Sequence, residues 1–325
     1  MTWSGHLWTI APRLLSRLAA GTPPAARAWR LPVADPVMGT VELAGRLTAP
    51  EGARRAVLVV HGLGGCGDSP YAVQAAAGAA ALGWACLRLH LRGSDLAGED
   101  IYHAGLSADL HAALASRELA GYETLYLLGY SLGGHLALKA ATEDELDPRV
   151  AAVAAVCAPL ALEPGARHLD SWPVWPYRRY LLGGLKRIYR QVVARAERDG
   201  RPLPLPFEAA RRIGTIVEWD ERIVAPRFGF AGASEYYRRA SVAPRLEGLR
   251  RPALLVAAPG DPMVPLPAVE AVLAGRDLPL LTVRREPGGH VGFPATLDLG
   301  APAPPGLVSQ VYGWLGSQLS EGTKR

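Results

Sequence analysis

The stretch Thr124-Leu125-Tyr126-Leu127-Leu128-Gly129-Tyr130-Ser131-Leu132-Gly133 decides the fold of this chain. Its first five residues predict a buried strand, and the Gly/Ala/Leu-rich run that starts at Leu132 predicts a helix. A serine on a sharp turn between strand and helix has a strained backbone and needs small neighbours, which Gly129 and Gly133 supply. Free N–H groups at the start of the helix favour negative charge near Ser131. The stretch therefore predicts a nucleophilic serine; the alternative is a tight turn with an idle serine.

The same rhythm of strands and helices extends to both sides of this turn. Strands are predicted at 56–60, 84–91, 124–128, 150–156, 252–258 and 280–284. Helices are predicted at 71–82, 105–119, 132–142, 267–274 and 307–319. Strands joined by crossover helices predict an α/β fold, with a mostly parallel sheet that is flanked by helices on both faces.

Residues 163–245 break this rhythm. They are rich in Trp and Tyr, and they hold sixteen Lys or Arg against nine Asp or Glu, a balance of +7 in a chain of net charge +5. We expect an inserted helical lid here, on a core formed by residues 30–162 and 246–325. Residues 1–29 are expected to pack on this core, with a short helix at 12–20 for which weak membrane-surface contact is the alternative.

Composition excludes several classes of protein. Of 325 residues, 49% are hydrophobic and 20% are charged, which is typical of a globular chain and not of a disordered one. No apolar run reaches the roughly 18 residues of a membrane span. Three cysteines are too few for a disulfide framework and fit no zinc site, so no metal is expected. The start of the chain lacks the pattern of a secretory signal, which predicts a cytoplasmic protein.

A serine nucleophile needs a base, and eight histidines compete for that role. His290 is the best candidate, because Gly288 and Gly289 precede it in a loop between the last predicted strand and the terminal helix. A glycine-flanked loop leaves the imidazole free to reach the serine. Structural roles are expected for the other histidines considered, which are His6, His103, His111, His135 and His168.

The base in turn needs a carboxylate that orients it. Asp261 follows the predicted strand at 252–258, with Asp277 and Asp298 as alternatives. The order Ser131, Asp261, His290 along the chain is typical of α/β-hydrolases. An oxyanion would be held by the N–H of Leu132 and by that of Leu63 in the glycine-rich loop at 61–65. That loop lacks a phosphate-binding pattern, so no cofactor is expected.

Taken together, these residues resemble the YheT-like branch of the α/β-hydrolase superfamily. The resemblance covers most of the chain and rests on an ordered set of stretches, which are 5–10, 61–71, 92–94, 102–105, 129–134, 228–230, 236–237, 240–241, 261–262 and 288–293. It implies a Ser131–Asp261–His290 triad and hydrolysis of acyl esters. Two departures are visible: Trp8 stands where the family usually has Gln, and Gly260 replaces the first residue of a usual Asp-Asp-Pro. We expect the first to leave catalysis untouched and the second to strengthen the assignment of Asp261.

The expected function is therefore that of a carboxylesterase, a serine hydrolase that forms an acyl-enzyme on Ser131 without a cofactor. Two alternatives stay open: an acyltransferase with the same triad, and a catalytically silent ligand-binding homologue. The aromatic lid suits an apolar, lipid-like acyl chain, and its positive charge suits an anionic group. Nucleic-acid binding is not expected, because the Arg residues are dispersed among acids and no recognition motif accompanies them. Cys66, beside the oxyanion loop, either lines the site or is a small buried residue.

Overall fold

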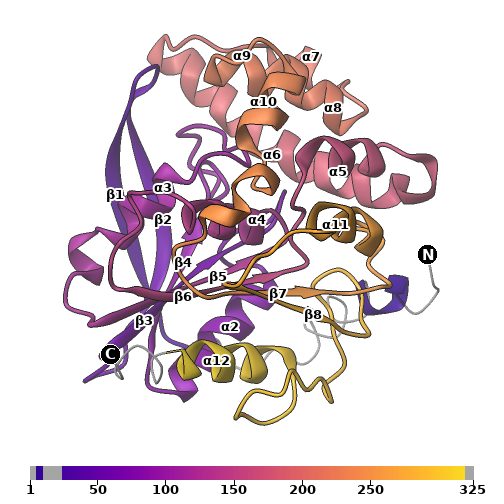
Figure 1. Cartoon of the computed structure of the whole chain (residues 1–325). Helices are drawn as coiled ribbons and strands as arrows, with labels where there is room; N and C mark the ends of the chain where they lie inside the picture. The colour runs from indigo at the N-terminus through magenta and orange to yellow at the C-terminus, as the bar shows by residue number, and fades with distance from the viewer. Residues whose placement is uncertain (1–4, 10–23, 319–325) are drawn as a thin grey trace.

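A computed structural model describes residues 5–9 and 24–318 of the chain. The predicted helix at 12–20 lies outside the described residues. Eight strands form one sheet in the order β1-β2-β4-β3-β5-β6-β7-β8. Neighbouring strands from β4 to β8 run parallel, whereas β1 and β2 form an antiparallel hairpin on β4 (Figure 1). This is the mostly parallel sheet that the sequence predicts.

The strand bounds lie close to the predicted ones. The parallel strands are β3 (Arg55–Val60), β4 (Ala85–His90), β5 (Thr124–Tyr130), β6 (Val150–Val156), β7 (Ala253–Ala257) and β8 (Leu281–Arg285). The sequence analysis did not identify the hairpin of β1 (Arg27–Asp35) and β2 (Gly39–Thr48). Charged residues and Pro32 interrupt the apolar pattern of β1, which is tolerated because this strand lies at an edge of the sheet.

Helices cover both faces of the sheet (Figure 1). One face packs on α2 (Pro70–Ala81) and α12 (Leu307–Ser317), and the other on α3 (Ala108–Leu114) and α4 (Leu132–Ala140). Side chains of a strand alternate between the faces, so that in β3 Leu58 joins one core cluster while Val57 and Val59 join the other. Two apolar cores thus hold the strands in place, and the residues of the candidate site lie at the ends of these strands.

A long helical insertion lies between β6 and β7, and we call it the helical insertion. It consists of α5 (Leu162–Leu169), α6 (Trp175–Asp199), α7 (Phe207–Ala210), α8 (Ile216–Trp219), α9 (Ala225–Phe228) and α10 (Ala233–Ala240), with short 3-10 and π turns between them. Figure 1 shows these helices stacked above one face of the sheet. That 163–245 acts as a lid stays a prediction.

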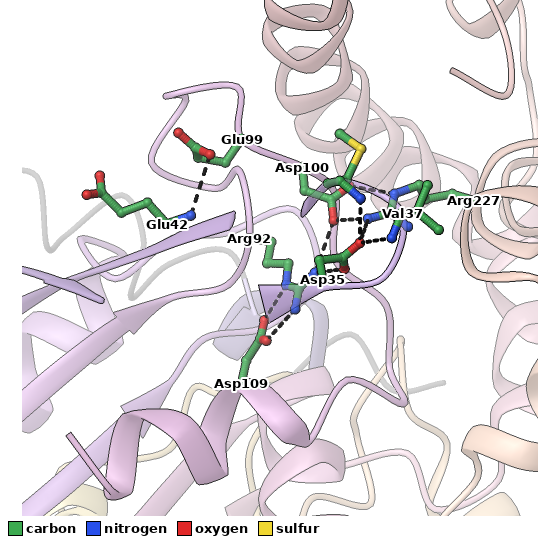
Figure 2. A network of polar contacts seen from close by, with 9 residues as sticks. Asp35, Val37, Glu42, Arg92, Glu99, Asp100, Asp109 and Arg227 are labelled. Carbon is green, nitrogen blue, oxygen red and sulfur yellow. Dashed lines mark hydrogen bonds and ion pairs between the residues drawn. The ribbon is translucent and has the colours of Figure 1, made fainter. Parts of the chain in front are cut away.

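Buried ion pairs join the helical insertion to the core (Figure 2). Arg227 of α9 pairs with Asp100 at 2.6 Å and with Asp35 at 3.0 Å. Arg92, which follows β4, pairs with Asp35 at 2.6 Å and makes two 2.8 Å hydrogen bonds to Asp109. All five side chains are buried, so each charge depends on its partners.

Opposing effects act on the pKa of Asp35 in this ion-pair network. Burial alone raises the pKa, but the backbone N–H of Met38 and the guanidinium of Arg92 outweigh burial and hold it well below its usual range. Asp35 is therefore ionised at neutral pH, as its two ion pairs require. The network links the β1–β2 hairpin, the segment after β4 and α9, which are far apart in the sequence.

Candidate active site

Ser131 occupies the turn between β5 and α4 that the sequence predicts. Its backbone has φ 53° and ψ −120°, in the left-handed half of the conformational map that non-glycine residues rarely adopt. The flanking residues must be glycines because a side chain would not fit at either position. A Cβ on Gly129 would lie 2.1 Å from the oxygen of Gly133, and a Cβ on Gly133 would lie 2.2 Å from the oxygen of Val60. The tight turn therefore holds Ser131 out of regular structure at the start of α4.

Asp261 and His290 lie in contact. Asp261 follows β7, His290 follows β8, and the imidazole Nδ1 lies 2.9 Å from Oδ2 and 3.1 Å from Oδ1 of the carboxylate. The backbone N–H groups of Met263 and Val264 donate to Oδ1 at 2.8 and 3.0 Å. Both side chains are buried. A carboxylate on Nδ1 leaves Nε2 as the nitrogen that can exchange a proton with a substrate.

The loop that carries His290 is held by the start of the chain. The backbone N–H of His290 donates to the Thr9 hydroxyl at 2.8 Å, and that hydroxyl donates to the oxygen of Gly5 at 2.7 Å. A Cβ on Gly289 would lie 2.2 Å from the Gly5 oxygen, so the glycine allows the close contact. Sequence analysis missed this role of Thr9, and no local signal links a residue near the start to a loop near the end.

The glycine-rich loop after β3 is fixed by buried side chains. The N–H of Gly64 donates to the Tyr102 hydroxyl at 2.7 Å, and that of Gly62 to the Tyr71 hydroxyl at 2.9 Å. His61 is buried between the oxygen of Gly62 and the N–H of Leu91, and burial lowers its pKa to about 3, so it stays neutral. Within the described residues, the N–H groups of Leu63 and Leu132 have no hydrogen-bond partner.

Two cavities share Ser131 as a lining residue. The larger chamber has a volume of about 740 Å³ and is also lined by His290 and Leu63, and by Trp8, Tyr177 and Tyr180. The smaller chamber has a volume of about 80 Å³ and lies between Ser131 and the helical insertion. Its wall includes Leu63, Leu132, Leu162, Ala166, Leu169, Leu185, Ile216, Asp220 and Tyr237. Trp8, whose departure from the family pattern is expected to leave catalysis untouched, lines the larger chamber.

Ser131 and His290 share the larger chamber, but the Ser131 hydroxyl makes no hydrogen bond to any described residue. In ligand-free sites catalytic hydrogen bonds are often long or poorly aligned and tighten only when substrate binds. The alternative acids Asp277 and Asp298 are exposed, whereas Asp261 is buried against His290.

The other histidines have partners of their own. His135 lies between the carbonyl oxygens of Pro159 and Ala240, and His111 contacts Glu143 at 2.9 Å. Burial lowers the pKa of His103, which packs among aromatic rings. His6 differs from expectation: its Nδ1 lies 2.7 Å from the Tyr177 hydroxyl, and its side chain lines the larger chamber.

A thiol lies beside the Asp–His pair. Cys157, at the end of β6 with φ 52°, has its Sγ 3.4 Å from the backbone nitrogen of Val291, and it forms with Asp261 and His290 a group whose possible ligand atoms lie within 4.8 Å. Burial raises the pKa of this thiol well above its usual value, which keeps it protonated and disfavours ligation of a metal. Cys66, considered above as a lining residue, lines neither chamber.

The positive charge of the helical insertion lies outside the chambers. Within the described residues, neither chamber is lined by Lys or Arg. Exposed arginines of the insertion pair with nearby acids instead, as Arg167 does with Glu163 and Arg222 with Glu218. The chambers therefore offer mainly apolar surface to a ligand, with polar groups but no Lys or Arg side chain among the described residues. No described helix is long and apolar enough to cross a membrane.

Comparisons with known proteins agree with this fold. Residues 55–294 match the family model described as alpha/beta hydrolase fold. The chain is 33% identical over 299 residues to "Putative esterase YheT" of Escherichia coli (strain K12), covering 89% of this chain and 84% of that protein. It is 25% identical to "Monoacylglycerol lipase" of Saccharomyces cerevisiae, over 59% of this chain and 43% of that protein. The chain therefore belongs to the α/β-hydrolase family.

Solved structures show the same fold. The esterase Pf2001 of Pyrococcus furiosus superposes with a TM-score of 0.52 at 14% identity, over 82% of this chain and 85% of that chain. Such a low identity carries the fold alone. These two curated relatives are named as an esterase and a lipase, so the chain is similar to proteins named as hydrolases.

Proposed function

We propose that this protein is a carboxylic-ester hydrolase with Ser131 as nucleophile, His290 as base and Asp261 as the residue that orients the base. One observation carries the proposal: a serine in a strained strand-to-helix turn lines the same chamber as His290, whose imidazole is paired with the buried Asp261. A hydroxyl is a weak nucleophile near neutral pH, and an oriented imidazole is the group that can take its proton.

The proposed reaction has two halves. His290 takes the Ser131 proton as the oxygen attacks the ester carbonyl, and the N–H groups of Leu63 and Leu132 hold the negative oxygen. His290 then gives that proton to the leaving alcohol, and an acyl-enzyme remains. Water then enters and loses a proton to His290 as it attacks the acyl carbonyl. The bond between the acyl carbon and the Ser131 oxygen breaks, His290 returns the proton to that oxygen, and the acid leaves. The unpartnered N–H groups and the clamped loop at Gly62 and Gly64 support the oxyanion assignment, because donors that are already in place need no reorganisation.

The test is hydrolysis of short 4-nitrophenyl esters by the purified protein and its Ser131→Ala variant. We expect kcat to fall by roughly 10³-fold or more in the variant. Ser317→Ala, on the helix α12 and distant from both chambers, is the matched control and should retain full activity. A fluorophosphonate should label the native protein at Ser131, as intact mass and peptide mapping would show. Equal activity of Ser131→Ala and the native protein would overturn the proposal.

A further inference from the structure

The two chambers have different relations to the proposed base. Of the described residues, His290 lines only the larger chamber and Leu132 only the smaller one, while Ser131 and Leu63 line both. A general acid must lie within hydrogen-bond reach of the leaving oxygen. The alcohol part of an ester therefore belongs in the larger chamber beside His290. The acyl part, on the other side of the carbonyl, then belongs in the smaller chamber.

The smaller chamber restricts the length of that acyl part. Its volume is about 80 Å³, against about 740 Å³ for the larger chamber. Side chains from α5, α6 and α8 form apolar walls, among them Leu162, Leu185 and Ile216. Such walls accept a short carbon chain and exclude a charged one.

One acidic group interrupts this apolar wall. Asp220 begins the π-helical turn η3 (Asp220–Val224), a kind of turn that is frequent at functional sites, and only 9% of its surface is exposed. The Tyr237 hydroxyl donates to Oδ2 at 2.7 Å. The other oxygen, Oδ1, has no hydrogen-bond partner among the described residues. Oδ1 is not one of the fully buried atoms that lack a partner, so it is accessible from the smaller chamber, which Asp220 lines, and can accept a hydrogen bond there.

We propose that Asp220 receives a hydroxyl group of the substrate, so that the preferred substrates are esters of short hydroxy acids. This inference rests on the proposed function, since it places the acyl group by reference to Ser131 and His290. A hydroxyl can donate to Oδ1 and is neutral, as the apolar walls require. A second carboxylate in the acyl chain would instead meet Asp220 at close range.

Burial supports the same choice of ligand. It raises the pKa of Asp220 to about 7, with Asp170 adding to the rise and Tyr237 opposing it. The group is therefore partly protonated near neutral pH. In either state it can hydrogen-bond with a hydroxyl, because the carboxylate accepts and the carboxylic acid also donates.

The experiment compares matched pairs of 4-nitrophenyl esters: 3-hydroxybutyryl against butyryl, and 6-hydroxyhexanoyl against hexanoyl. For the native protein we expect at least one hydroxyacyl ester to exceed its parent in kcat/KM by about 10-fold, the effect of one buried hydrogen bond to a polar or charged partner. Asp220→Leu, branched at the same carbon but larger and apolar, should reduce that ratio to about 1. Glu197→Gln, an acid replaced on the exposed surface of α6, is the matched control and should keep the native ratio.

The outcomes separate this inference from the proposed function. If butyryl ester is cleaved in a Ser131-dependent way but neither hydroxyacyl ester is preferred, the inference is wrong and the esterase stands. An unchanged ratio in folded Asp220→Leu also contradicts it. If no ester is cleaved and Ser131 is not labelled, both fall. Should Asp220→Leu fail to fold, the ratio measured for the native protein decides alone.

Discussion

Thr9 accepts a hydrogen bond from the backbone of His290 although 281 residues separate them. The contact fixes the loop of the proposed base from the opposite end of the chain. It involves no atom of the imidazole itself. Thr9 is therefore a positioning residue, and its contribution is to the orientation of His290.

We expect Thr9→Val, which keeps the shape and removes the hydroxyl, to lower kcat by about 10-fold with a smaller change in KM, since orientation acts mainly on the chemical step. Thr9→Ser keeps the hydroxyl and should restore most of the activity. Steady-state kinetics on a butyryl ester measures both variants. If Ser and Val variants lose activity equally, the hydroxyl has no role in positioning.

The glycines around Ser131 lead to a prediction about stability. In Gly133→Ala the new methyl group would lie 2.2 Å from the oxygen of Val60, which belongs to a buried strand and cannot move away. We expect the free energy of unfolding to fall by about 3 kcal/mol or more, measured by urea denaturation. Gly183→Ala is the matched control: Gly183 lies in α6 with nothing near its Cβ position, so the change should stabilise by about 0.5–1 kcal/mol.

Arg227 links the helical insertion to the core, and its removal should be costly. Arg227→Met leaves Asp35 and Asp100 buried with one cation fewer, so we expect a loss of about 3–5 kcal/mol in urea denaturation. Adding Asp100→Asn should recover part of that loss, because it removes a buried charge that has lost one of its two cationic partners. Arg239→Met breaks an ion pair with Glu235 and a cation–π contact with Phe230, both made by an exposed guanidinium, and should change stability by about 1 kcal/mol or less. Equal losses in both single variants would contradict a special role of the network.

Asp220 predicts a dependence of stability on pH. Its folded-state pKa, raised to about 7, lies above the ordinary value near 3.9 of an unfolded chain. The folded state therefore binds the proton more tightly, so this contribution is complete below about pH 4 and is lost as pH rises through about 7. Asp220→Asn has no such proton. Between pH 5 and pH 8.5 its free energy of unfolding should therefore rise relative to that of the native protein by about 2–4 kcal/mol. Denaturation of both proteins across this range tests it, and parallel curves would contradict it.

Much of the core could be predicted from the sequence because its signals are local. The strand at 150–156 and the start of a helix at Leu132 follow from apolar runs and from the glycines beside Ser131, and the structure has both. The β1–β2 hairpin could not be predicted from apolar pattern alone. An edge strand needs no continuous apolar run, and Arg27, Arg30 and Pro32 interrupt this one.

The parts of the site that sequence analysis missed depend on distant contacts. The pairing of His290 with Asp261 could be expected because each follows a strand of one parallel sheet. The position of Thr9, by contrast, depends on a segment near the start of the chain, and the order of strands and helices does not predict where that segment lies. The two chambers depend on how α5, α6 and α8 pack over Ser131, and Asp220 is recognisable as unusual only once its burial is known.

The position of His290 on one side only of Ser131 has a consequence for the second half of the proposed reaction. The same imidazole must give a proton to the departing alcohol and take one from the next nucleophile. The two molecules therefore occupy the larger chamber one after the other, while the acyl group stays in the smaller chamber. The order of events is thus ping-pong. Water in the larger chamber, of about 740 Å³, would lead to release of an acid, and a second alcohol there would lead to transfer of the acyl group. The molecule that enters this chamber after the first alcohol leaves, and not the three proposed catalytic residues, would decide between these two outcomes.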